Sequence, residues 1–257
     1  MEERFKRLYN IKENLYAENS PVILEKGVLL LDTKSNKLLV QLKFYNIANK
    51  PFKALYVSIN TYDTSAQQMS PVEYKYLDLN VGYGKNFGSD KAIILNDNTV
   101  RSFEIGKYSI VYNDNEIQTF SSPFSQLPDS GFLQNKFADE ELVRQYRIET
   151  SRYSQYVPMQ YKNIWKCACG KWNSENICWN CRVTKGNILG KLTDPKLAVS
   201  KEIRLEQERI RKELQESQRI KEEQEEKVEE KKQAEKNKNI IVASVIGIVV
   251  CICVMSG

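Results

Sequence analysis

The sequence predicts a mainly β protein. An immunoglobulin- or fibronectin type III-like β-sandwich is followed by a small cysteine-built module, a long charged α-helix and a C-terminal transmembrane helix. Three observations predict this order. Short apolar runs fill residues 21–121, four cysteines gather within residues 165–181, and charges crowd residues 198–239 before an uncharged end. The 257 residues are enough for one or two domains.

Residues 1–20 do not have the pattern of a signal peptide, because charged residues interrupt them and no apolar core segment is present. Phe5, Leu8, Leu15 and Tyr16 recur at roughly helical spacing, which predicts a short amphipathic helix that Pro21 ends. We expect its apolar face to pack on the following domain. A membrane surface is the alternative for that face.

Residues 21–121 are rich in Val, Ile, Leu, Tyr and Phe, and every second residue is apolar in 38–44 and 55–59. This alternation is typical of half-buried strands. About seven short strands in a hundred residues, separated by Asn, Asp, Ser and Pro turns, indicate a two-sheet sandwich. None of the six cysteines lies in the first 166 residues, so hydrophobic packing must stabilise it. The expected strands are Val22–Leu31, Lys37–Tyr45, Lys53–Tyr62, Val72–Leu79, Ala92–Leu95, Val100–Tyr112 and Glu116–Phe120.

The phrases QLKFYNI, KALYVSI and YLDLN carry a resemblance within this region. Through them most of residues 20–180 resemble the N-terminal domain of uncharacterised bacterial membrane proteins. The resemblance implies a membrane protein with an N-terminal β-sandwich, and it implies no activity.

Residues 122–164 are predicted to connect the sandwich to the cysteine-built module. The stretches 121–125 and 127–131 have the Ser, Pro, Asp and Gly content of loops. Residues 138–147 are expected to form a short helix, because acidic residues open it and basic residues close it, as the helix dipole favours. We therefore expect two separately folded domains that are able to pack together.

The four cysteines form two tight pairs, Cys167/Cys169 and Cys178/Cys181, with eight residues between the pairs. Two turns that face each other present four thiolates at tetrahedral corners, the ligand set that Zn²⁺ takes in closed structural sites. We predict a zinc ribbon over residues 165–190, with Gly170 permitting a sharp turn. Two disulfides, or two redox-active pairs, are the alternatives.

Together with Trp165 and Asn173, these cysteines resemble the Ran-binding-protein type zinc finger. The resemblance implies that Trp165 packs on the metal core and that Asn173 hydrogen-bonds across the two turns. Here the first pair is one residue tighter than in that family, and four residues rather than six separate Asn173 from Cys178. Gly170-Lys171 stands where some members carry a ubiquitin-binding Thr-Phe pair, so ubiquitin binding is not expected.

Five basic residues surround the predicted site, and they partly offset the two negative charges of a zinc tetrathiolate. The alternative is that they join Trp172 and Trp179 in a face that stacks single-stranded nucleic acid. The five are Lys166, Lys171, Arg182, Lys185 and Lys191.

The chain is not expected to be an enzyme. It has no histidine, which removes the usual general base, the Ser-His and Cys-His nucleophile pairs and every imidazole metal ligand. Gly82-Tyr83-Gly84 is too short for a dinucleotide motif. The carboxylates of the sandwich are scattered, mostly at turns, where Asp is a turn former: Asp63, Asp78, Asp90, Asp97 and Asp114.

Residues 198–239 are predicted to form a charged helical stalk. Opposite charges recur three or four residues apart, which supports a single solvated helix of about 60 Å. A weak homodimeric coiled coil through residues 200–236 is the alternative, because Ile203, Ile210, Leu214 and Val228 give only a thin apolar stripe. The expected charge pairs are Glu208/Lys212, Arg209/Glu213, Arg219/Glu223, Glu223/Lys227 and Lys231/Glu235.

Residues 240–257 are predicted to be a single transmembrane anchor, since 240–255 carry no charge and approach the length that spans a bilayer. Lysines just before the run predict that everything upstream is cytoplasmic, a reducing location that suits zinc thiolates. Cys251 and Cys253 fit as small apolar residues. The sequence thus predicts a non-enzymatic adaptor that presents binding surfaces to a partner protein, with a membrane-tethered nucleic-acid-binding ribbon as the alternative.

Overall fold

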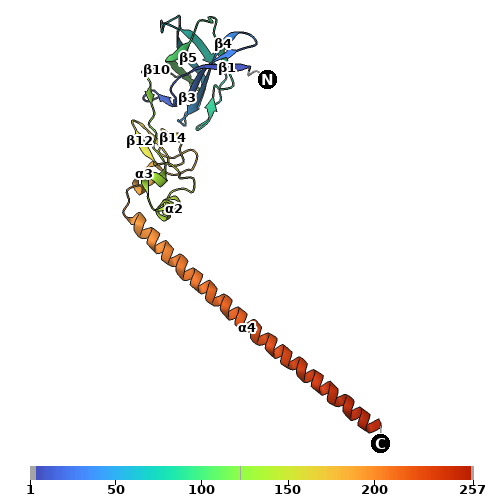
Figure 1. The fold of residues 1–257 in the computed structure, drawn as a ribbon. Coiled ribbons are helices and arrows are strands. Elements are labelled where there is room, and N and C mark those ends of the chain that lie inside the picture. Colours follow the sequence, from blue (N-terminus) through green and yellow to red (C-terminus); the bar gives the residue numbers. More distant parts are fainter. Residues whose placement is uncertain (1–3, 122, 256–257) are drawn as a thin grey trace. The chain divides into compact units, whose positions relative to one another are not determined.

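The computed structural model describes residues 4–121 and 123–255, with side chains as far as residue 237 except that of residue 235. The chain is mainly β, with several sheets and one long C-terminal helix (Figure 1). It divides into two compact units, Met1–Leu197 and Ala198–Gly257. The first unit contains both the strand-rich region and the four-cysteine region.

Two antiparallel sheets form the strand-rich region. A seven-stranded sheet is centred on β3 and β4, with β2 and β11 on one side, β7 on the other, β1 paired with β3 and β8 with β4. A four-stranded sheet has the order β10-β9-β5-β6. The first sheet contains β1 (Phe5–Asn10), β2 (Leu15–Tyr16), β3 (Val22–Asp32), β4 (Lys37–Asn46), β7 (Asn86–Phe87), β8 (Ala92–Ile94) and β11 (Ser125–Gln126). The second contains β5 (Phe52–Tyr62), β6 (Val72–Tyr76), β9 (Ser102–Tyr112) and β10 (Ile117–Ser121).

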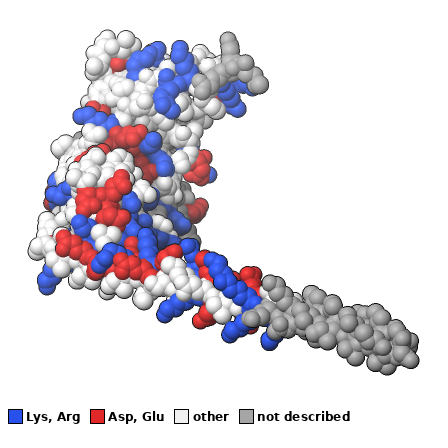
Figure 2. Space-filling view, turned by 60° about the horizontal axis from the view of Figure 1, so that its bottom comes forward, with Lys and Arg blue, Asp and Glu red and all other residues white. Residues whose placement is uncertain are grey.

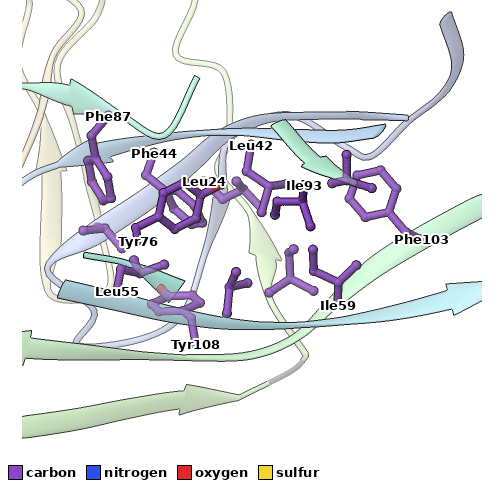
Figure 3. Close-up of a cluster of buried hydrophobic side chains, with 14 of the residues drawn as sticks. Leu24, Leu42, Phe44, Leu55, Ile59, Tyr76, Phe87, Ile93, Phe103 and Tyr108 are labelled. Atoms are coloured by element: carbon purple, nitrogen blue, oxygen red, sulfur yellow. The ribbon is translucent and has the colours of Figure 1, made fainter. Parts of the chain in front are cut away.

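The core lies between these two sheets. The predicted alternation along β4 is confirmed, because Leu38, Val40, Leu42 and Phe44 are all buried and belong to one cluster. Figure 3 shows side chains of both sheets pointing toward one another in this cluster. Phe44 is fully buried at its centre, where side chains of both sheets surround it.

The prediction of a helix in residues 1–20 is wrong, because this stretch contains the strands β1 and β2. Both strands pair with β3, an eleven-residue strand whose edge offers more hydrogen bonds than an isolated short helix gains. The ring of Tyr9 also reaches the core, 5.9 Å from the ring of Phe103. Tertiary pairing has overridden the helical spacing of the apolar residues.

An ion pair links Arg4, which directly precedes β1, to Asp32 at the end of β3. The Arg4 guanidinium lies 3.2 Å from the Asp32 carboxylate, which also accepts hydrogen bonds from the backbone N–H of Lys34 and the hydroxyl of Ser35. These bonds, that of Arg4 first, lower the pKa of Asp32 from 3.8 to about 2.

This lowered pKa predicts an acid-sensitive contribution to stability. A carboxyl group whose pKa is lower in the folded chain stabilises it fully above the unfolded pKa, and the contribution disappears as the pH falls through the folded pKa. The unfolding free energy should therefore fall between about pH 4 and about pH 2. Urea unfolding across this range should show a shallower fall for Asp32→Asn than for the wild type. Equal slopes would contradict the role of Asp32.

The four-cysteine region is larger than the predicted ribbon. It contains a three-stranded sheet in the order β12-β13-β14, and three short helices cover its cysteines. The expected connector 122–164 is therefore not a linker, because β11 belongs to the sandwich sheet and the rest belongs to this region. Its elements are α1 (Leu133–Lys136), α2 (Glu140–Glu149), β12 (Met159–Tyr161), β13 (Ile164–Lys166), β14 (Trp172–Asn173) and α3 (Lys185–Lys191).

The predicted short helix exists as α2, shifted by two residues. Asp139 caps it, because its carboxylate accepts a hydrogen bond of 2.8 Å from the backbone N–H of Glu141. Val143 and Tyr146 of α2 are buried beside the cysteines, and the Tyr146 hydroxyl donates to the carbonyl of Ile188 in α3 at 2.7 Å. The helices thus form one core with the cysteine turns.

The long helix α4 (Lys196–Met255) has 60 residues, or about 90 Å at the usual rise, and extends beyond the predicted stalk. Acidic and basic residues alternate along its described surface (Figure 2). Two expected pairs are present, Arg209–Glu213 at 3.2 Å and Arg219–Glu223 at 3.6 Å. Glu208 pairs with Arg204 at 2.9 Å.

The transmembrane helix expected at 240–257 lies outside the residues whose side chains are described. Among the residues that the structure does describe, no helix is long and apolar enough to cross a membrane. The backbone of α4 continues to Met255.

Candidate metal centre

The four predicted ligands lie together. The sulfurs of Cys167, Cys169, Cys178 and Cys181 are all within 4.8 Å of one another, although 14 residues separate the first from the last. The shortest separations cross between the pairs, 3.4 Å from Cys167 to Cys181 and 3.6 Å from Cys169 to Cys178. All four are free cysteines, and these separations are far longer than the S–S bond of about 2.0 Å. The cluster can hold a metal ion.

Two hairpin turns position the sulfurs. In the first, Gly170 donates its backbone N–H to the carbonyl of Cys167 at 2.8 Å, and in the second, Arg182 donates to Cys178 at 2.9 Å. Both donors have a left-handed backbone, with φ of +87° at Gly170 and +64° at Arg182. The ring of Tyr156 packs against the first turn, because a Cβ on Gly170 would lie 2.8 Å from its Cε2. Glycine is therefore required there for both conformation and space.

The thiols influence one another's ionisation. Hydrogen bonding among the four sulfurs lowers the pKa of Cys169 and that of Cys181, the latter to about 7, and it raises the pKa of Cys167 and of Cys178 above the ordinary value of 9.0. Thiolates are the metal-binding form of cysteine. Two of the four cysteines are therefore favoured as thiolates, and a bound cation would displace the protons of the other two.

Trp165 and Asn173 hold the two turns together. Trp165 is fully buried in the cluster that includes Cys167 and Cys178, and its indole N–H donates to the Glu175 carbonyl at 2.6 Å. The fully buried Asn173 side chain donates to the Lys171 carbonyl at 2.8 Å and accepts from the Trp179 backbone N–H at 3.2 Å. One amide therefore joins the first turn to the second.

The surrounding cations mostly have partners. Lys166 pairs with Asp129 at 3.4 Å, and Lys191 pairs with Glu149 at 2.6 Å and with Asp194 at 2.9 Å. The remaining three occupy turns or ring contacts: Lys171 lies over the rings of Tyr45 and Trp179, Arg182 closes the second turn, and Lys185 begins α3.

Trp172 and Trp179, the residues of the alternative stacking face, contact the sandwich. Trp172 is only 8% exposed and packs in a cluster with the sandwich residues Tyr16 and Ile23. Trp179 lies 6.3 Å from the ring of Tyr45 and donates its indole N–H to the hydroxyl of Tyr45. Both tryptophans therefore pack against the sandwich.

Sequence reasoning missed two residues of the sandwich that contact this centre and a third that holds their loop. The Tyr83 hydroxyl lies 3.1 Å from the Asn173 side-chain oxygen, and Gly84 lies beneath Trp179. Asn46 is fully buried and donates to the carbonyls of Val81 and Gly82, which holds this loop in place. The glycines that bracket Tyr83 were a signal of a tight turn, but nothing in the sequence pointed from that turn to the cysteines.

Comparisons of this chain with protein-family models, with curated proteins and with solved structures return no match.

Proposed function

We propose that the cysteine cluster is a structural zinc site. One observation carries the proposal: four sulfurs converge from two turns that share one buried core. With Zn–S bonds of about 2.3 Å, tetrahedral sulfurs lie about 3.8 Å apart, close to the separations between the pairs. Four thiolates with no nitrogen or oxygen ligand favour zinc over Mg²⁺ or Ca²⁺. Such a set leaves no position for a catalytic water.

The metal content of the full chain, purified in detergent, tests this proposal. We expect about one zinc ion per chain by elemental analysis, because a closed tetrathiolate site binds a single ion. Cys169→Ser should lose it, since three sulfurs no longer close the site. Cys253→Ser is the matched control and should keep the ion. A metal-free wild-type chain prepared with zinc present and reductant maintained would refute the proposal.

We infer that the sandwich is of the immunoglobulin- or fibronectin type III-like kind. Strands β3, β4 and β8 follow one another in one sheet, and β10, β9, β5 and β6 follow one another in the other. The two sheets contain sequential hairpins and exchange strands between β4 and β5 and between β8 and β9. This strand exchange around one core supports the sandwich assignment made from the sequence.

We propose that the whole chain is a membrane-anchored, cytoplasmic, non-enzymatic adaptor that presents the sandwich–ribbon unit to a partner protein. A closed metal site shapes a surface and offers no coordination position to a substrate. The uncharged run 240–255 and the lysines before it support anchoring, and the alternating charges of α4 support a solvated stalk. Weak self-association through the exposed Ile203, Ile210, Leu214 and Val228 is the alternative use of α4.

A further inference from the structure

The segment between the two cysteine pairs is held by the sandwich. Ser174 lies in this segment, and both its backbone N–H and its hydroxyl donate to the carbonyl of Ile47, at 3.1 and 2.7 Å. The carboxylate of Glu175 accepts from the backbone N–H of Asn49 at 3.4 Å. The residues just after β4 therefore contact the span that sets the distance between the two metal-binding turns.

A tyrosine of the sandwich contacts both ends of that span. The Tyr83 hydroxyl lies 3.1 Å from the side-chain oxygen of Asn173 and 3.3 Å from the carbonyl of Ile177. Asn173 is the residue that joins the two turns, and Ile177 directly precedes the predicted ligand Cys178. The position of one hydroxyl of the sandwich is thus coupled to the position of a metal ligand.

The second contact between the sandwich and the cysteine turns is the packing of the Trp179 ring on Gly84. Trp179 follows Cys178, and a Cβ built on Gly84 would overlap its indole ring. Gly84 also has φ of +77°, and its backbone N–H donates to the carbonyl of Asn46 at 2.9 Å. The Asn46 side chain in turn fixes Val81 and Gly82, so the loop is held in the shape that accepts Trp179.

We propose that the sandwich completes the metal centre, with Tyr83 and Gly84 as positioning residues for the turn that carries Cys178 and Cys181. Binding of a divalent metal ion and docking of the four-cysteine region on the sandwich are then one coupled equilibrium. Neither residue touches the metal, and both act through Asn173 and Trp179. The inference rests on the proposed zinc site and adds the part of the chain that determines its affinity.

Zinc affinity of the full chain, measured by competition with a chromophoric chelator, tests this coupling. Tyr83→Phe removes only the hydroxyl, and we expect it to weaken zinc binding by about 3- to 10-fold, the effect of one lost hydrogen bond. Gly84→Ala displaces Trp179 and should weaken binding by about 10-fold or more, as loss of ligand support does. The absorption spectrum of the Co²⁺-saturated chain should stay that of a tetrathiolate in both variants, because the ligands are unchanged.

Two control variants separate this effect from general destabilisation. Tyr62→Phe removes a hydroxyl elsewhere on the sandwich, where it donates to Glu104 at 3.4 Å. Gly106→Ala crowds a side chain into β9, where its Cβ would lie 3.0 Å from the side-chain oxygen and nitrogen of Asn60. Both should keep wild-type zinc affinity. Equal weakening in these controls, or wild-type affinity in both Tyr83→Phe and Gly84→Ala, would overturn the inference. If Gly84→Ala does not fold, the zinc affinity of Tyr83→Phe is compared with that of Tyr62→Phe, and a weaker affinity of Tyr83→Phe alone supports the inference.

Failure of the coupling can be told from failure of the zinc site. If the wild-type chain binds no metal, the proposed function falls and this inference falls with it. If the wild-type chain binds zinc tightly and only the coupling is absent, the site stands alone. Because coupling is reciprocal, zinc should also slow amide hydrogen exchange at Gly84 and Lys85 in the wild type. It should leave the β9–β10 hairpin unchanged, and equal exchange at Gly84 with and without zinc would again overturn the inference.

Discussion

Stripping the metal from the full chain with a chelator is expected to unfold the four-cysteine region. Its core is built around Cys167 and Cys178, and it is too small to persist without an ion that joins its two turns. Structural zinc contributes about 10–16 kcal/mol of apparent binding free energy in zinc-finger peptides, more than the stability of most domains. The four-cysteine region should therefore lose its folded structure completely when the metal is removed at neutral pH.

The tryptophans make this loss easy to measure. All three tryptophans of the chain, Trp165, Trp172 and Trp179, belong to the four-cysteine region, so tryptophan fluorescence and the tryptophan bands of the near-ultraviolet circular dichroism report on this region and on its contact with the sandwich. Chelation should abolish these tryptophan bands, and added zinc should restore them. Cys167→Ser should reproduce the chelated state, and Cys253→Ser should not. An unchanged signal in a chain shown to be metal-free would mean that the metal is not structural.

Replacing Phe44 with alanine is expected to lower the unfolding free energy of the sandwich by about 3–5 kcal/mol, because it leaves a cavity in a closed core. The Phe44 ring lies 5.3 Å from that of Phe87 and 6.1 Å from those of Tyr76 and Tyr108, so both sheets lose contacts. Urea unfolding followed by far-ultraviolet circular dichroism measures the change.

The control for Phe44 is an apolar residue outside the core. Ile117 in β10 is 60% exposed, and Ile117→Ala should change the unfolding free energy by no more than about 0.5 kcal/mol. A Phe44→Ala variant as stable as Ile117→Ala would show that the two sheets do not share the core described above.

The sequence predicted the parts of the sandwich in which each strand carries its own signal. The apolar alternation along 38–44 and 55–59 predicted both strands and the face that each one buries. The apolar residues of these faces are buried as expected. Residues 5–16 were misassigned because their apolar spacing suits a helix. Their structure is decided by the edge of β3, which adds hydrogen bonds that no local pattern reveals.

The cysteine positions were predictable for a similar reason, since two tight pairs converge by local turn geometry. Their support was not predictable. Tyr83 and Asn173 are separated by 90 residues, and their contact follows from how two modules pack. The connector was misjudged because Leu133, Val143 and Tyr146 are buried only against the cysteine turns, which the local composition does not show.

The cluster joining Tyr16, Ile23 and Tyr45 to Ile164 and Trp172 has a consequence for the order in which the protein is made. During synthesis the residues of this sandwich face leave the ribosome well before the residues that cover it, because they come earlier in the chain. Until then this face is bare in the nascent chain, where such surfaces promote misassembly. The proposed zinc site therefore predicts that efficient biosynthesis depends on the cellular zinc supply, because a loaded cysteine region would have the shape that covers this face.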